Sequence, residues 1–212
     1  MSDPYVYLGT SVLINHFDIR DERELQQVER LITSSQFNPL PELTSLTPAG
    51  YSNLHKHIFG RLYPWAGEFR TVPIAKPQAL FCLPQFIEPQ LENCFSNISD
   101  DKDLLSSDYK TFSHALAEHL SQLDAIHPFR EGNGRTMRLF IETFALQRGI
   151  PFNTKHLSRE AWMDASITVF KSGDTTLMQK LLHTTIEKTT RANELDKYQR
   201  QKGNIEKDNS LE

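Results

Sequence analysis

The stretch His127-Pro-Phe-Arg-Glu-Gly-Asn-Gly-Arg-Thr-Met-Arg138 decides the fold, because it joins the two segments of the chain with the strongest helical patterns. Before it, residues 108–126 place apolar side chains on one face at helical spacing. After it, a second helix is expected from about Gly134 to Gln147, with Gly149 placed as its C-cap. The sequence therefore predicts two helices connected by a glycine-containing loop.

The remaining pattern predicts an all-α domain with one small β-hairpin. Thr47-Pro48 has the form of a helix N-cap followed by proline, and helical spacing continues from there until Pro64 and Gly67. Other helices are expected at residues 21–35, 85–97, 158–170 and 174–192. Two short strands are expected at residues 69–74 and 79–83, joined by a turn at Lys76-Pro77-Gln78.

The length and composition indicate one soluble globular domain. The 212 residues divide into an irregular lead-in at 1–20, the domain at 21–192 and a polar tail at 193–212 that we expect to be flexible. A net charge of −4 argues against a general nucleic-acid binder. No apolar stretch approaches the ~20 residues of a membrane span, and the two cysteines favour a reducing compartment. We expect a cytoplasmic protein without nucleic-acid or membrane partners, and leave delivery into another cell open.

The loop has the composition of a phosphate-binding site. Gly132-Asn133-Gly134 allows a sharp turn that exposes several N–H groups in a row, at the point where the next helix begins. Arg135 and Arg138 are three residues apart on that helix and therefore share a face. These features together favour a polyphosphate ligand.

The same loop contains a metal ligand and a base. Glu131 is the carboxylate among these phosphate binders, where it could hold Mg²⁺, and His127 could accept a proton from an incoming hydroxyl. Phe129 is expected to anchor the loop in the core. Taken singly, a histidine before proline, a Gly-Asn-Gly turn and two spaced arginines are more often structural features. Their combination indicates nucleotidyl or phosphoryl transfer.

Residues His127 to Arg138 resemble the signature of the Fic family, His-x-Phe-x-(Asp/Glu)-Gly-Asn-Gly-Arg-x-x-Arg, at every specified position. Upstream, the segment from Leu54 to Arg70, which contains Trp-Ala-Gly-Glu-Phe-Arg, resembles the family's helix before its hairpin flap. The resemblance spans about residues 45–190. The chain is similar to the Fic domains of toxin–antitoxin pairs and of type IV secretion effectors. It implies a Fic-type helical bundle in a bacterial protein adenylyltransferase.

The resemblance implies a role for each residue of the loop. His127 would deprotonate a Tyr, Thr or Ser hydroxyl of a target protein, which attacks the α-phosphate of ATP. Glu131 would bind Mg²⁺ between the α- and β-phosphates. Arg135 would contact the β-phosphate and Arg138 the γ-phosphate. The full set expected around ATP and its phosphates is Phe129, Gly132, Asn133, Gly134, Arg135 and Arg138.

The resemblance also implies that the hairpin is a flap that clamps the target backbone by strand addition. The residues expected to contact the target are Thr71, Val72, Pro73, Ile74, Leu80, Phe81 and Cys82. The alternative is a hairpin that only covers the core.

Regulation is expected to come from a second protein. Many Fic proteins are inhibited by a glutamate in the pattern (Ser/Thr)-x-x-x-Glu-(Gly/Asn), which pairs with the second signature arginine, here Arg138. The chain has one partial match, Thr190 to Glu194, followed by Leu195. We therefore expect a small antitoxin-type inhibitor that carries the complete pattern, while inhibition in cis by Glu194, or none, remains the alternative. Two other functions stay open: a Doc-like phosphotransferase, disfavoured by Gly134, and a catalytically silent binding module, disfavoured by the intact His127 and Glu131.

Overall fold

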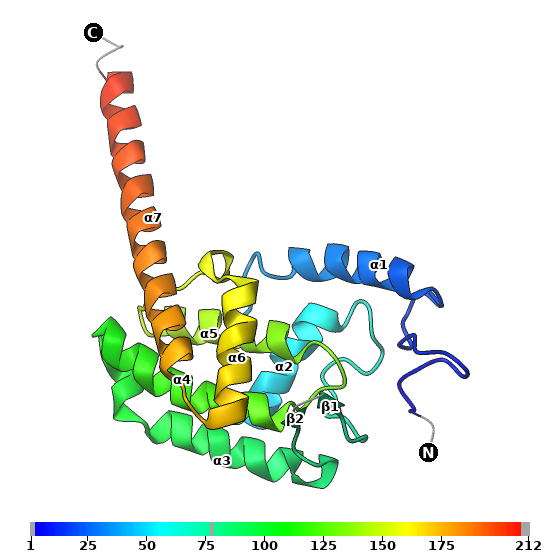
Figure 1. The fold of residues 1–212 in the computed structure, drawn as a ribbon. Helices are drawn as coiled ribbons and strands as arrows, with labels where there is room; N and C mark the ends of the chain where they lie inside the picture. Colours follow the sequence, from blue (N-terminus) through cyan, green and yellow to red (C-terminus); the bar gives the residue numbers. More distant parts are fainter. Residues whose placement is uncertain (1–2, 77–78, 209–212) are drawn as a thin grey trace.

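The computed structural model describes residues 3–76 and 79–208, and it is a helical bundle with one two-stranded hairpin (Figure 1). The helices are α1 (Glu22–Ser35), α2 (Pro48–Phe59), α3 (Ile87–Asp100), α4 (Tyr109–Ile126), α5 (Asn133–Gln147), α6 (Arg159–Ser172) and α7 (Thr176–Asp208). The strands are β1 (Ala75–Lys76) and β2 (Ala79–Leu80), and single 3-10 turns occur at Pro84–Phe86, Lys102–Leu105 and Thr154–His156. The predicted all-α class with one hairpin is confirmed.

Several helices begin where the sequence supplies a cap. The side chains of Asp21, Thr47, Asp108 and Ser158 each accept a hydrogen bond from a backbone N–H in the first turn of α1, α2, α4 and α6. Each bond satisfies one of the amides that a helix leaves without an internal partner. These polar residues therefore fix the starts of four helices.

Helix α5 lies in the middle of the bundle, with α2 and α4 packed against it (Figure 1). Its buried residues lie on all sides of the helix and include Met137, Phe140, Ile141 and Phe144. A helix that is buried all round belongs to the core rather than to a surface layer. The loop that precedes α5 is therefore attached to a helix of the core.

The first strand of the hairpin is shorter and later than the predicted strand at residues 69–74. Ala75 pairs with Leu80 and Lys76 with Ala79, in antiparallel register. Upstream of β1, the N–H of Arg70 donates to Pro128 O at 2.9 Å, so this backbone is bonded to the loop instead of to a strand. Pro73, which has no N–H, also interrupts a ladder. The predicted turn lies partly outside the described residues, at 77–78.

Helix α7 continues beyond Ala192 to Asp208, so the predicted helix end was wrong. Residues 193–208 contain no proline and many good helix formers, and these favour continuation. The predicted tail at 209–212 lies outside the described residues. In Figure 1 the C-terminal part of α7 projects from the bundle.

The lead-in packs against the domain although it forms no helix between residues 3 and 21. Tyr5 and Val12 are buried, Val6 bridges to Leu13, and the Trp65 Nε1–H donates to Ile14 O at 3.2 Å. Met1 and Ser2 lie outside the described residues. The described lead-in is therefore packed against the segment that follows α2.

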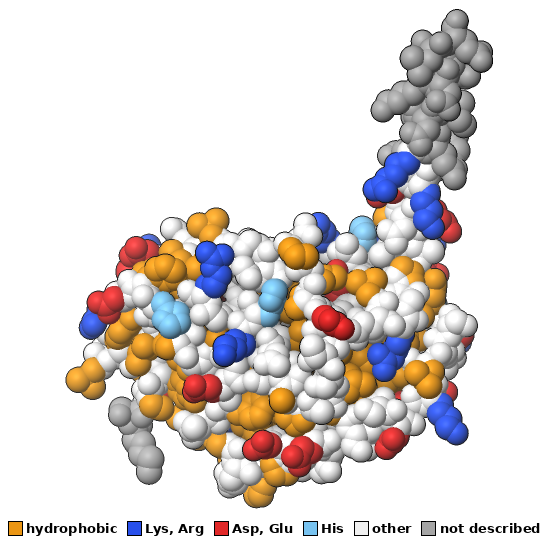
Figure 2. Space-filling model, turned by 180° about the vertical axis from the view of Figure 1, so that it is seen from behind, with side chains coloured by type: hydrophobic (Ala, Val, Ile, Leu, Met, Phe, Trp, Pro, Cys, Tyr) orange, Lys and Arg blue, Asp and Glu red, His pale blue; other side chains and the backbone are white. Residues whose placement is uncertain are grey.

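The described surface shows neither a membrane-spanning helix nor one dominant charge on the face in Figure 2. Among residues 3–76 and 79–208, no helix combines the length and apolarity needed to cross a bilayer. On the face drawn in Figure 2, basic and acidic side chains are scattered among apolar ones.

Candidate active site

The site is built on the junction between α4 and α5. Helix α4 ends at Ile126, and His127 follows in the left-handed conformation with φ 47°, its N–H bonded to Leu123 O at 3.1 Å. Helix α5 starts after Gly132, which has φ 82° and provides no side-chain cap. The first amides of α5 therefore point out of the helix toward the loop, together with the positive end of its dipole.

The side chain of Asn133 closes the loop on itself. Its Oδ1 accepts the N–H of Phe129 at 2.8 Å, and its Nδ2–H donates to Phe129 O at 2.8 Å. Phe129 is fully buried, and its ring stacks on that of His55 with centroids 3.9 Å apart. The side chains of Asn133 and Phe129 thus both stabilise the conformation of the loop. Phe129 was expected both to anchor the loop in the core and to lie among the ATP ligands; its side chain has no exposed surface and anchors the loop.

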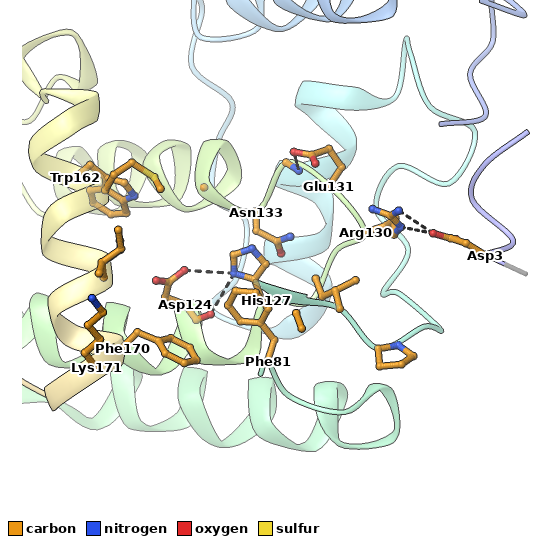
Figure 3. A pocket seen from close by; sticks show the side chains of 18 residues that line it. Asp3, Phe81, Asp124, His127, Arg130, Glu131, Asn133, Trp162, Phe170 and Lys171 are labelled. Carbon is orange, nitrogen blue, oxygen red and sulfur yellow. Dashed lines mark hydrogen bonds and ion pairs between the residues drawn. The ribbon is translucent and has the colours of Figure 1, made fainter. Parts of the chain in front are cut away.

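A pocket of about 780 Å³ opens in front of this loop (Figure 3). One side is the loop from Glu131 to Gly134, and another is the face of α6 that carries Trp162 and Phe170. The flap contributes Pro73, Ile74, Ala75 and Phe81, while Asp3 and Arg130 lie at the edge. The pocket therefore combines an amide-rich polar end with an apolar and aromatic wall.

His127 lies inside the pocket with one ring nitrogen already engaged. Its Nδ1 is 3.2 Å from Asp124 O and 3.3 Å from Asp124 Oδ1, as the dashed lines in Figure 3 show. The ring stacks on Phe81 with centroids 3.9 Å apart. Because both Asp124 oxygens are acceptors, Nδ1 carries the proton and Nε2 is left as the acceptor. The arrangement gives His127 the tautomer and fixed ring that a general base needs.

Glu131 and the two arginines occupy different positions around the helix start. The half-exposed Glu131 lines the pocket and accepts the Gly132 N–H at 2.8 Å. Arg135 donates to Glu29 Oε1 on α1 at 2.6 Å and lies 3.4 Å from Glu131 Oε1. Arg138 has no carboxylate partner among the described residues, and burial together with Arg135 and Arg159 lowers its pKa. Neither arginine lines the pocket itself.

Comparisons with known proteins agree with this geometry. Residues 45–145 match the model of the Fic/DOC family. The chain is 34% identical over 175 residues to the probable protein adenylyltransferase y4lH of Sinorhizobium fredii, covering 82% of this chain and 91% of that protein. The chain belongs to the Fic/DOC family. It is also 30% identical to protein adenylyltransferase VbhT of Bartonella schoenbuchensis, covering 89% of this chain but 40% of that protein.

The Fic fold is also found among solved structures. The chain superposes on the BepC effector protein of Bartonella tribocorum, solved with bound AMPPNP, with a TM-score of 0.78 and 23% identity. The match covers 85% of this chain and 95% of that one. Family membership and the Fic fold, both predicted from the sequence, are confirmed.

The structure distributes the predicted flap residues of this Fic domain over three environments. Pro73, Ile74 and Phe81 line the pocket, and Leu80 is 71% exposed beside it. The remaining residues are fastened at the base of the flap: the Thr71 N–H bonds to the Tyr5 hydroxyl at 3.0 Å, and the carbonyls of Val72 and Cys82 accept from Arg70. Among the described flap residues, those at the base are therefore bonded to the rest of the domain, whereas Leu80 is exposed to solvent.

Sequence reasoning missed residues that support the Fic site. Asp124 precedes His127 by one helical turn, and its spacing was the available signal. His55 is a second supporting residue that was missed. Its Nδ1 accepts the Gly67 N–H at 2.8 Å, so its Nε2–H donates to Glu131 O at 3.0 Å. Burial lowers the pKa of His55 to about 4. The aromatic wall on α6 had no local signal, because only the packing of α6 brings Trp162 to the loop.

Proposed function

We propose that this Fic/DOC-family chain is a protein adenylyltransferase, which transfers AMP from Mg-ATP to a Tyr, Thr or Ser hydroxyl of a target protein. The observation that carries the proposal is the juxtaposition, in one pocket, of an oriented histidine acceptor and an open, glycine-lined helix start. Relatives named protein adenylyltransferases support it.

Gly132 and Gly134 show why this helix start suits phosphates. A Cβ on Gly132 would lie 2.3 Å from ring carbons of Phe59, so that glycine serves the fold. A Cβ on Gly134 would meet nothing within 4 Å and would project at a pocket-lining position. The chain itself leaves room there, and an anion that approaches the α5 amides would fill it. The absence of a side chain at Gly134 thus favours ligand binding, whereas at Gly132 it is required for packing against Phe59.

The reaction follows from the free acceptor on His127. Nε2 takes the proton of the target hydroxyl while its oxygen forms a bond to the α-phosphorus of ATP. The bond from that phosphorus to the bridging oxygen of the β-phosphate breaks, and pyrophosphate leaves. The charged imidazolium that results is stabilised by the Asp124 carboxylate, 3.3 Å from Nδ1. The N–H groups at the start of helix α5 would stabilise the negative charge of the phosphates.

The residues present fit a magnesium ion held mainly by its nucleotide. The described residues contain no group of three or more His, Cys, Asp or Glu side chains placed to hold a metal. Mg²⁺ commonly needs one or two carboxylates, with phosphate and water oxygens as its other ligands, and Glu131 supplies a carboxylate at the pocket. When bound, the ion would neutralise phosphate charge and favour departure of pyrophosphate.

The apolar wall supports a nucleotide rather than a simple polyphosphate. Trp162 and Phe170 on α6 face the pocket opposite the loop (Figure 3). Aromatic side chains are suitable partners for the flat face of a base. The distal flap, with β1 and β2, would receive the target as an added strand and bring its hydroxyl to His127.

Inhibition by a separate small protein remains our proposal for regulation of this bacterial, cytoplasmic enzyme. Arg138 is without a carboxylate partner in the described chain, so it could accept a glutamate from outside. Glu194 is exposed on α7, which argues against inhibition in cis. A helical partner carrying Ser/Thr-x-x-x-Glu would supply the missing carboxylate.

The proposal is tested with ATP labelled at the α-phosphate, incubated with a cell lysate and with wild type, His127→Ala or Glu131→Ala. Wild type should label a protein, whereas His127→Ala should bind ATP normally and label none. Glu131→Ala should lose Mg²⁺-dependent binding and labelling together. A parallel incubation uses ATP labelled at the γ-phosphate. Labelling of a protein only from this second ATP would indicate a Doc-like phosphotransferase. ATP binding without labelling from either position would indicate a silent binding module.

A further inference from the structure

Arg70 is a buried cation that the proposed mechanism does not use. It is 1% exposed and lies in the segment between α2 and β1. Its guanidinium donates to four backbone carbonyls: His127 at 2.8 Å, Val72 at 2.8 Å, Ile126 at 3.2 Å and Cys82. All four acceptors are carbonyl oxygens, and among the described residues no carboxylate forms an ion pair with Arg70.

Two of these carbonyls belong to the end of α4. Ile126 is the last residue of the helix and His127 is its C-cap, where carbonyls lack internal partners and carry partial negative charge. The N–H of Arg70 also donates to Pro128 O at 2.9 Å. Arg70 therefore bonds to three successive residues across the left-handed turn that presents His127.

The other two carbonyls belong to the base of the flap. Val72 precedes β1 and Cys82 follows β2, so one guanidinium joins both legs of the hairpin. The Cys82 N–H adds a direct bond to Ala125 O on α4 at 3.1 Å. The flap and the end of α4 are thus joined both by this direct backbone bond and through the guanidinium of Arg70.

We infer that Arg70 is a positioning residue that locks the base of the flap to the His127 turn, so that a target held by the flap arrives at a fixed distance from Nε2. The inference rests on the proposed function for its catalytic consequence. Its structural part, the rigid coupling of flap and turn, stands on the hydrogen bonds alone.

Arginine suits this position because of its shape. The guanidinium is planar and presents five N–H donors in a rigid fork, which can serve carbonyls from two directions. A lysine ammonium keeps the charge but is a point donor, and it cannot span the four oxygens that Arg70 joins. The Arg70→Lys variant therefore removes the side-chain bridge between the flap and the His127 turn, while it retains the cation and the backbone bonds.

The test compares Arg70→Lys with Arg148→Lys in the full chain. Arg148 is a matched control, since it is half-buried at the end of another helix, α5, and its Nη1 lies 3.5 Å from Phe144 O. Arg70→Lys should lower kcat for AMP transfer by about 100-fold, as expected for a reacting group misplaced by about 1 Å, with ATP affinity unchanged. Arg148→Lys should lower neither. Equal effects of the two variants on kcat, or a loss of ATP affinity in proportion to kcat, would overturn the inference.

Hydrogen exchange of the wild-type protein tests the coupling independently of any activity and of whether Arg70→Lys folds. If Arg70 locks the two segments, the amides of Arg70, Cys82 and His127 should open with one common free energy as denaturant is raised. Separate opening of the flap amides at a lower free energy than the His127 amide would refute the coupling. If the coupling holds but the wild type transfers no AMP, the proposed function fails and the structural role of Arg70 remains.

Discussion

Replacing Gly134 by alanine should separate ligand binding from folding at the start of α5. The new Cβ would meet no atom within 4 Å, and Gly134 has an ordinary helical backbone as the second residue of α5. Alanine is a better helix former than glycine, by up to about 1 kcal/mol per residue. We therefore expect Gly134→Ala to be as stable as wild type, or slightly more stable.

The same methyl group should impair ATP binding. It would occupy the approach to the α5 amides, and loss of one hydrogen bond to a charged group costs about 1.5–3 kcal/mol. The Kd for Mg-ATP should therefore rise by about 10- to 150-fold. Isothermal titration calorimetry measures this affinity, and thermal unfolding of the same samples measures stability.

Gly132→Ala is the matched control with the opposite outcome. Its Cβ would lie 2.3 Å from Phe59, and its φ of 82° disfavours any side chain. A left-handed backbone costs about 1–2 kcal/mol and overpacking about 1–3 kcal/mol, so the loss of stability should be about 2–5 kcal/mol. The reasoning is refuted if Gly134→Ala binds Mg-ATP as tightly as wild type, or if it loses as much stability as Gly132→Ala.

Three further predictions follow from the site. Asp124→Asn should lower kcat for transfer by about 10- to 100-fold with ATP affinity unchanged, because the charge beside His127 Nδ1 is lost; unchanged kcat would remove Asp124 from the mechanism. His55 has a folded-state pKa of about 4 against 6.5 unfolded. As the pH falls from 6.5 to about 4, His55 therefore binds a proton in the unfolded chain before it does so in the folded chain. Denaturant titrations should show about 3 kcal/mol of folding stability lost over this fall in pH. That share should be absent in His55→Phe, and an identical pH profile would contradict it. Glu194→Gly should leave automodification by the isolated chain unchanged, whereas strong activation would place the inhibitor in cis.

The sequence was sufficient for the fold class because the strongest signals were local. The spacing of apolar residues in 108–126 and 134–147 predicted α4 and α5 closely, and Thr47-Pro48 predicted the start of α2. These signals act through backbone amides and neighbouring turns, which sequence patterns record directly. The first strand was predicted too early in the chain. Arg70 lies within the predicted strand, but its N–H donates to Pro128 O, which is distant in sequence, instead of to a neighbouring strand.

The candidate site was predicted in part for the same reason. The loop from His127 to Gly134 is contiguous, so its pocket-facing members could be recognised together. The supporting role of Phe129 depends on a tertiary contact, the stacking of its ring on His55, whereas Asn133 bonds within the loop itself. The Glu29 partner of Arg135 comes from α1, more than one hundred residues earlier. No spacing rule within the loop could have shown that Arg135 is engaged by it.

The most direct test of the central claim is the intact mass of a modified target protein after incubation with the enzyme and Mg-ATP. Attack on the α-phosphate predicts a gain of about 329 Da, one adenylyl group, that requires His127 and is absent with His127→Ala. A gain of about 80 Da, one phosphoryl group, or a gain that persists in His127→Ala, would contradict the account.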